Sequence, residues 1–155
     1  MEIERKYLVK DTSFVGEAFR KRRIVQGYIC SDAKRTVRVR ISGEEGFLTI
    51  KSETNERGWS RYEFEYPISL KDAEELLDLC LPGRIEKVRY EVKVGDHIWE
   101  VDVFQGDNDG LVVAEIELES EGEAFEMPEW VGEEVSGDAR YYNAMLALCP
   151  FTNFF

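Results

Sequence analysis

Charged and apolar residues alternate along many short segments of this chain. In the first segment, Glu2, Glu4 and Lys6 fall on one face of a strand, because side chains in a strand alternate faces with period two. Ile3 and Tyr7 fall on the opposite face. The same alternation predicts further strands at residues 24–29, 36–40, 48–51, 61–65, 87–90, 99–102 and 114–118.

The charged faces of these strands are sorted by sign. For a single strand, a solvated outer face is the simpler interpretation, but solvated faces usually mix both signs with uncharged polar residues. Here acidic sets and basic sets follow one another along the chain. The sets are Arg38 with Arg40, Thr49 with Lys51, Arg61 with Glu63 and Glu65, Lys87 with Arg89, Glu100 with Asp102, and Glu115 with Glu117.

Like charges two positions apart on one face repel each other, so the pattern favours a guest of opposite sign between them. Carboxylates bind divalent cations, and guanidinium groups bind phosphate oxygens. The guest that satisfies both kinds of face is a polyphosphate with its metal ion.

Length and charge restrict the class of protein. The chain has 155 residues, 43% of them hydrophobic, which suits a single domain spanning residues 1–155. Its formal net charge of -12 argues against nucleic-acid partners, so an anion must be held by a local cationic pocket. We find no apolar run of the roughly 20 residues that a membrane helix needs, and a strand that starts at residue 2 leaves no room for a signal peptide. We therefore expect a cytoplasmic protein without a membrane partner.

Cysteine and histidine chemistry is not indicated. Cys30, Cys80 and Cys149 are widely spaced and odd in number, so neither a disulfide framework nor a zinc site is expected. The single histidine, His97, lies next to Asp96 in a predicted turn and is interpreted as a surface or structural residue.

Three helices are predicted between and after the strands. One covers residues 73–80 after a capping box at Ser69, and a shorter one covers residues 14–20. Asp138 caps a third at residues 139–149, whose first turn carries Arg140. Arg140 is open to two interpretations, a ligand for a nearby anion or a surface residue. The acidic stretch 119–134 is predicted to be a solvated connection.

These elements predict an α+β protein in which about eight antiparallel strands form a closed β-barrel with the charged faces inside and a few helices outside. The apolar exterior then needs a cover, either by helices or by a second subunit, which leaves a homodimer open. An outer-membrane barrel is also polar inside, but strands of about five residues are too short for the roughly 9 to 11 that cross a bilayer.

The ordered motifs resemble the CYTH superfamily of triphosphate tunnel metalloenzymes, in its short bacterial form. The resemblance extends over essentially the whole chain, and although the first motif alone is weak, the ordered set is specific. Val103 and Gln105 depart from the pattern, at positions where relatives are expected to carry an acid and a histidine. The motifs are Glu2-Ile-Glu-Arg-Lys6, Gln26-Gly-Tyr28, Arg38-Val-Arg40, Leu48 to Lys51, Glu63-Phe-Glu-Tyr-Pro67, Lys87-Val-Arg-Tyr90, Trp99-Glu-Val-Asp102, Ala114-Glu-Ile-Glu117 and Gly137-Asp-Ala-Arg-Tyr141.

The resemblance implies hydrolysis of a triphosphate inside the barrel, with Mg²⁺ or Mn²⁺ as cofactor. The residue chemistry gives the same division of labour, since phosphoryl transfer requires positioning and charge neutralisation. The expected phosphate ligands are Lys6, Arg38, Arg40, Lys51, Arg61, Lys87, Arg89 and Arg140. The expected metal ligands are Glu2, Glu4, Asp102, Glu115 and Glu117. Glu63, Glu65, Glu100 and Tyr28 are the candidates for catalysis by orienting water or substrate.

Some assignments have structural alternatives. Arg61, Glu63 and Glu100 are equally explained as internal salt bridges, and Tyr28 as a packing residue. Inorganic tripolyphosphate is the expected substrate, because no further aromatic module or basic tail is visible. A nucleoside or thiamine triphosphatase, an adenylate cyclase of the same superfamily, and a non-catalytic polyphosphate or nucleotide-binding module are the alternatives.

Overall fold

The computed structural model describes residues 1–32 and 34–154, and strands dominate it. In this part of the chain the strands are β1 (Glu2–Val9), β2 (Arg20–Ser31), β3 (Arg35–Ser42), β4 (Glu45–Ser52), β5 (Ser60–Arg61), β6 (Glu63–Ile68), β7 (Ile85–Val94), β8 (His97–Phe104), β9 (Val112–Glu117) and β10 (Val131–Glu134). The α-helices are α1 (Phe14–Glu17), α2 (Leu70–Leu77) and α3 (Asn143–Leu148), and 3₁₀ turns lie at η1 (Gly106–Asn108), η2 (Ala139–Tyr141) and η3 (Phe151–Asn153).

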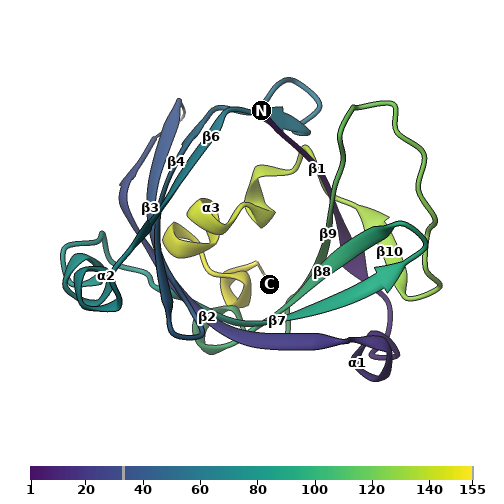
Figure 1. Ribbon diagram of the computed structural model, residues 1–155, viewed down its shortest axis with the longest axis horizontal. Coiled ribbons are helices and arrows are strands. Elements are labelled where there is room, and N and C mark those ends of the chain that lie inside the picture. The colour runs from purple at the N-terminus through teal and green to yellow at the C-terminus, as the bar shows by residue number, and fades with distance from the viewer. Residues whose placement is uncertain (33, 155) are drawn as a thin grey trace.

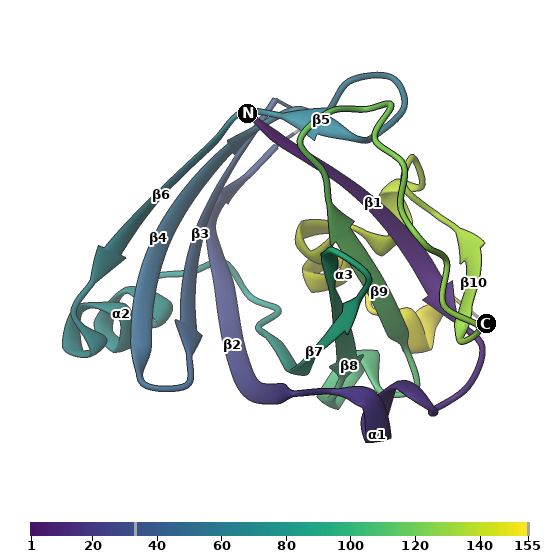
Figure 2. The same ribbon diagram turned by 45° about the vertical axis from the view of Figure 1, so that its right-hand side comes forward.

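The strands form one antiparallel sheet that curls into a nearly closed barrel. Its order is β10-β1-β9-β8-β7-β2-β3-β4-β6, and the short β5 pairs with β1. Only Tyr62 separates β5 from β6, so the two ends of the sheet are brought together. Figure 1 shows the strands as a ring seen end on, and Figure 2 shows their slant. The predicted antiparallel barrel is confirmed.

All the predicted strands form, and the structure adds two that the alternation did not show. One is the two-residue β5, cut off from β6 within the predicted strand 61–65. The other is β10, which lies in the stretch predicted as a connection and pairs with the end of β1, Tyr7 opposite Glu134 and Val9 opposite Val131. The prediction for residues 119–134 was therefore wrong at its end, because four residues are too few to show a period.

The apolar faces point outward and are covered by the chain itself. On the β1, β9, β8 and β7 side, Trp99, Ile116 and Trp130 belong to one core with Phe14 of α1. On the opposite side, α2 packs Ala73 and Leu77 on β3. Ser69 caps α2 as predicted, its Oγ accepting from Asp72 N at 3.0 Å. The helix lies so close to β4 that a Cβ on Gly46 would be 2.8 Å from the Cβ of Ala73.

The C-terminal segment was predicted as one helix, and this was wrong in two respects. Tyr142 adopts an extended conformation (ψ 134°) that separates η2 from α3. The segment also lies within the ring of strands instead of outside it (Figure 1). Leu146 and Tyr141 pack there with Ile85, Phe104 and Val113 in a third core. The end of the chain therefore fills one part of the barrel interior.

The first predicted helix is shorter than expected. α1 ends at Glu17 because Ala18 is extended (ψ 135°), and β2 begins at Arg20. Phe14 is buried, whereas Val15 and Phe19 are 47% and 58% exposed. Among the helices that the structure describes, none has the length and apolar character to cross a membrane.

Candidate active site

A cavity of about 790 Å³ lies inside the barrel and is lined by the inward faces of the strands. Period two explains this, because most apolar residues of the strands face the exterior cores and most of the charged residues face inward. All predicted site residues line the cavity except Asp102 and Arg140. Those that line it are Glu2, Glu4, Lys6, Tyr28, Arg38, Arg40, Lys51, Arg61, Glu63, Glu65, Lys87, Arg89, Glu100, Glu115 and Glu117.

Asp102 lies just behind the cavity wall in a compact ion cluster. Its carboxylate accepts two hydrogen bonds from Arg89, Nε to Oδ1 at 2.8 Å and Nη2 to Oδ2 at 2.9 Å, and its Oδ2 lies 2.7 Å from Lys87 Nζ. Burial would raise the pKa of Asp102, but Arg89 and Lys87 hold it well below its usual range. Burial lowers the pKa of Lys87 to about 7 despite this partner. Asp102 is thus a counter-ion to two cations.

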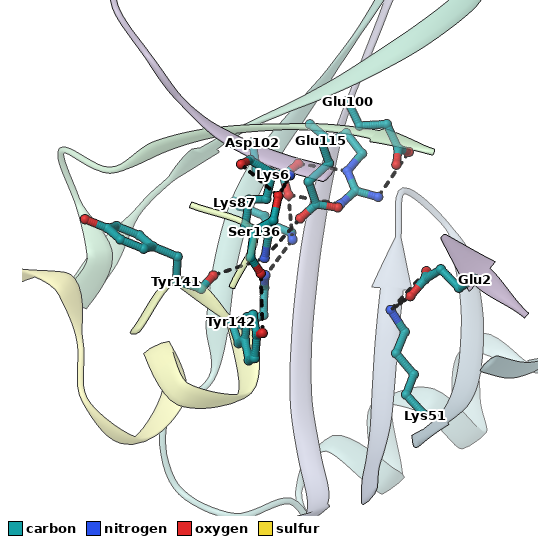
Figure 3. Close-up of polar contacts among 12 residues, drawn as sticks. Glu2, Lys6, Lys51, Lys87, Glu100, Asp102, Glu115, Ser136, Tyr141 and Tyr142 are labelled. Atoms are coloured by element: carbon teal, nitrogen blue, oxygen red, sulfur yellow. Dashed lines mark hydrogen bonds and ion pairs between the residues drawn. The ribbon is translucent and has the colours of Figure 1, made fainter. Parts of the chain in front are cut away.

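Glu2 is the centre of a second ion cluster, at the start of β1. Lys51 Nζ lies 3.1 Å from Glu2 Oε1, and Arg61 Nε lies 3.2 Å from the same atom. The same ammonium lies 3.1 Å from Glu63. Burial would raise the pKa of Glu2, but Lys51 and Arg61 hold it well below its usual range. Figure 3 shows Glu2 with Lys51 apart from the group formed by Lys6, Glu115, Asp102 and Lys87.

Glu4 and Glu117 are two acids of the cavity that have no cation within ion-pair distance among the described residues. They are directly opposite each other in the β1–β9 register. Within residues 1–32 and 34–154, neither side chain forms an ion pair or hydrogen bond; the Glu115 carboxylate, by contrast, lies 3.3 Å from Lys6 Nζ. Burial, with the nearby Glu115 and Glu2, raises the pKa of Glu4 to about 8. Burial and then Glu2 raise the pKa of Glu117. The two carboxyl groups therefore lie together without a cationic side chain to neutralise them.

Arg38 and Arg40 are the complementary case, cations without an acid. Arg38 Nη2 donates to Thr49 Oγ1 at 3.2 Å, and its buried Nε has no hydrogen-bond partner among the described residues. Arg40 Nε donates to Gln26 Oε1 at 2.7 Å. In the described part of the chain, no carboxylate lies within ion-pair distance of either guanidinium. Burial, with the charges of Arg38 and Arg89, lowers the pKa of Arg40 to about 9. Phosphate oxygens are suited to this pair.

The remaining predicted residues divide into those facing the cavity and one that does not. Glu65 accepts from Thr49 Oγ1 at 3.4 Å, and Glu100 accepts from Arg89 Nη1 at 3.2 Å. Tyr28 is buried, and its hydroxyl accepts from Gln26 Nε2 at 3.2 Å. Arg140 is exposed and pairs with Asp138 at 2.6 Å, so the structure places it away from the cavity.

Several polar residues of the cavity were missed, among them Arg22 and Asn143. Arg22 lies on β2 with Tyr28, and the same period-two count would have found it, had the predicted strand begun at residue 20. Asn143 comes from α3, and its Oδ1 accepts from Lys87 Nζ at 2.8 Å. No periodicity indicates that a helix lies inside a barrel, so the sequence carried no signal for Asn143.

A nearly closed barrel whose lumen is lined by arginines and lysines on some strands and by carboxylates on others has the architecture of a tunnel protein. More specifically, the chain belongs to the CYTH domain family, whose sequence profile matches residues 1–142. The family resemblance seen in the motifs is confirmed.

Two curated relatives and a solved structure are similar over nearly the full chain. The inorganic triphosphatase of Acetivibrio thermocellus is 43% identical over 158 residues, covering 99% of this chain and 97% of the relative. The inorganic triphosphatase of Nitrosomonas europaea is 40% identical over 151 residues, covering 95% and 97%. The crystal structure of the inorganic triphosphatase NE1496 superimposes with a TM-score of 0.68 at 38% identity, covering 96% of this chain and 95% of that one.

Proposed function

We propose that this protein hydrolyses inorganic triphosphate with the help of a divalent metal ion. The observation that carries the proposal is that one cavity holds unpaired arginines, Arg38 and Arg40, and unpaired carboxylates, Glu4 and Glu117. A triphosphate with its metal ion supplies the missing charge of both signs. The relatives named inorganic triphosphatase support the same reaction and substrate.

The cations of the cavity form the substrate clamp. Arginine holds phosphate oxygens through two parallel N–H groups, and lysine acts as a compact charge. Arg38 and Arg40 are free to bind phosphate directly, whereas Lys51 and Arg61 are first tied to Glu2. Arg140 is left out of the clamp because it lies outside the cavity. The clamp consists of Lys6, Arg38, Arg40, Lys51, Arg61, Lys87 and Arg89.

The acids opposite the clamp fit Mg²⁺ or Mn²⁺. Among the described residues, no three acidic, histidine or cysteine side chains are gathered closely enough to enclose a metal ion on their own. Mg²⁺ nevertheless usually takes only one or two carboxylates, and completes its shell with water and substrate phosphates. Glu4 and Glu117 meet that need, with Glu2 and Glu115 beside them. A bound ion would neutralise phosphate charge and acidify a water molecule. We assign Asp102 to charge balance, since Arg89 and Lys87 occupy both of its oxygens.

The water that attacks the terminal phosphorus needs an acceptor to orient it. Glu63 is held by Lys51 and Glu100 by Arg89, which leaves Glu65 with one long hydrogen bond from Thr49. We assign this orienting role to Glu65. Tyr28 holds Gln26 through its hydroxyl and thereby helps to position Arg40, which Gln26 also contacts.

A substrate panel tests the proposed function. Phosphate release from tripolyphosphate should exceed that from pyrophosphate, ATP and thiamine triphosphate under matched Mg²⁺ or Mn²⁺. Equal or faster turnover of an organic triphosphate would refute the substrate. Cyclic nucleotide formation from ATP would indicate a cyclase, and tight binding without turnover would indicate a binding module.

We also propose that the chain is a single domain that acts as a cytoplasmic homodimer, with neither nucleic acid nor membrane as partner. The free thiols Cys30, Cys80 and Cys149 suit a reducing compartment. Tyr62, Phe64 and Tyr66 form an outward aromatic row beside the edge of the sheet, 56%, 53% and 55% exposed, and suit a face shared by two copies. Sedimentation velocity on wild type and Phe64→Ser should show a dimer that the substitution weakens; a monomeric wild type would exclude it.

A further inference from the structure

The C-terminal segment contributes a polar side chain to the cationic side of the cavity. Asn143 Oδ1 accepts from Lys87 Nζ at 2.8 Å and from Gln26 Nε2 at 3.2 Å. Gln26 in turn accepts from Arg40 Nε at 2.7 Å. Asn143 is therefore linked to two residues of the clamp, one directly and one through Gln26.

These contacts fix which way the amide of Asn143 points. If the group were flipped, its NH₂ would face the ammonium of Lys87 and the amide NH₂ of Gln26, and three donors would meet without an acceptor. With Oδ1 on that side, Nδ2 keeps both of its hydrogens for another partner. Within the described residues, Nδ2 has no hydrogen-bond acceptor, although Asn143 lines the cavity.

Asn143 also lies where the inner surface changes from charged to apolar. On β1 the inward row runs from Lys6 to Leu8, and on β7 from Lys87 back to Ile85. Leu8 and Ile85 belong to the core that Leu146 and Tyr141 fill. A phosphate group could not be solvated beyond this boundary on these strands.

The segment that carries Asn143 is held firmly in place. Leu146 is fully buried, and the backbone carbonyl of Tyr141 accepts from Lys6 Nζ at 3.1 Å. Outside the cavity, Thr152 Oγ1 donates to the carbonyl of Asp107 at 2.8 Å. A side chain on such a segment has a fixed position relative to the clamp.

We propose that Asn143 is a substrate-binding residue, whose Nδ2 donates a hydrogen bond to a phosphate oxygen next to Lys87 at the apolar end of the clamp. This inference rests on the proposed function and deepens it, because it adds the C-terminal segment to the substrate site. A neutral donor contributes a directional bond at the end of the phosphate chain without adding another buried charge.

Calorimetric titration with tripolyphosphate in EDTA tests the inference without turnover. Asn143→Ala should weaken binding about tenfold, as expected for loss of a hydrogen bond to a charged group. Asn143→Asp keeps the Oδ1 acceptor but loses the donor, and should weaken binding at least as much. Thr152→Val loosens the same segment outside the cavity and should bind as wild type does.

The outcomes separate this inference from the proposed function. Wild-type affinity in a folded Asn143→Ala variant would overturn the role of Asn143, and so would equal weakening in Thr152→Val. Should the Ala variant fail to fold, Asn143→Asp decides in the same way. Phosphate release is measured on the same wild-type preparation: wild type that neither binds nor hydrolyses tripolyphosphate contradicts the proposed function itself.

Discussion

Carboxylates in two regions of the barrel lumen have opposite electrostatic environments. Asp102 is buried between Arg89 and Lys87 and has a pKa well below its usual range. Glu4 faces Glu117 across β1 and β9 and has a pKa raised to about 8. The first region is balanced by the protein's own cations, whereas in the second no cation of the described residues lies within ion-pair distance of either acid. In the function that we propose, the first kind of charge maintains the fold and the second binds a metal ion.

A substitution in the balanced region, Asp102 with Lys87 and Arg89, should have the largest effect on stability. Asp102→Asn leaves the buried Lys87 without its counter-ion and Arg89 with Glu100 alone, and breaking a buried ion pair in this way typically costs about 3 to 5 kcal/mol. We expect the free energy of unfolding to fall by that amount in urea titrations at pH 7 in EDTA. Glu4→Gln, measured alongside, should not be destabilised. A fully stable Asp102→Asn would show that the two regions do not differ as described.

Substitutions in the unpaired region, Glu4 and Glu117, should have the largest effect on activity. Glu4→Gln and Glu117→Gln should each lower phosphate release from tripolyphosphate roughly a hundredfold or more, about 3 kcal/mol in the transition state, because each loses a ligand for the metal ion. Glu129→Gln changes an exposed acid outside the cavity and should remain fully active. Wild-type rates in both lumen variants would place the metal site elsewhere.

The sequence predicted which residues face the lumen because a strand has a strict period of two. The same rule predicted Glu4, Glu117 and Asp102 alike as metal ligands, since each lies on the charged face of its strand. Which acid meets a cation depends on the cross-strand register, and Asp102 lies opposite Arg89 whereas Glu4 lies opposite Glu117. A single strand carries no information about that pairing.

The C-terminal segment shows a second limit. The apolar stripe of residues 139–149 predicted a helix, and the expectation that the helices lie outside the barrel misplaced it, because the lumen and the exterior of a barrel both offer apolar surface. Arg140 was for this reason a candidate phosphate ligand, although it is exposed and bound to Asp138. Asn143, on the same segment, reaches the lumen instead.

The unpaired arginines should determine how strongly the ligand stabilises the fold. A ligand that binds only the folded state adds about 2.7 kcal/mol at a hundredfold excess over its Kd. Tripolyphosphate in EDTA should therefore raise the melting temperature of wild type by several degrees. Combined Arg38→Ala and Arg40→Ala should abolish the rise.

The control for that experiment removes the same charge elsewhere. Arg57 and Arg84 have side chains 64% and 45% exposed, and both lie outside the cavity. Combined Arg57→Ala and Arg84→Ala should keep the ligand-induced rise. A rise of wild-type size in the Arg38 and Arg40 variant would mean that the triphosphate binds elsewhere.

The smallest expected effect is a pH dependence that belongs to Glu4. Its folded-state pKa of about 8 is above the ordinary value of 4.5, so between these pH values the folded protein holds a proton that the unfolded chain has released. The contribution of this protonation to the free energy of unfolding is complete below pH 4.5 and is lost as the pH rises through 8. Without metal, wild type should lose stability relative to Glu4→Gln as the pH rises from 5.5 to 8.5.

Urea titrations of both proteins at four pH values in EDTA measure this difference. The variant has no titrating group at position 4, so the shared effects of the net charge of -12 cancel in the comparison. Parallel curves would show that Glu4 is already ionised in the folded protein at neutral pH. Glu4 would then be negatively charged without a cation beside it. It would differ from Asp102 in its location and partners, but not in its ionisation.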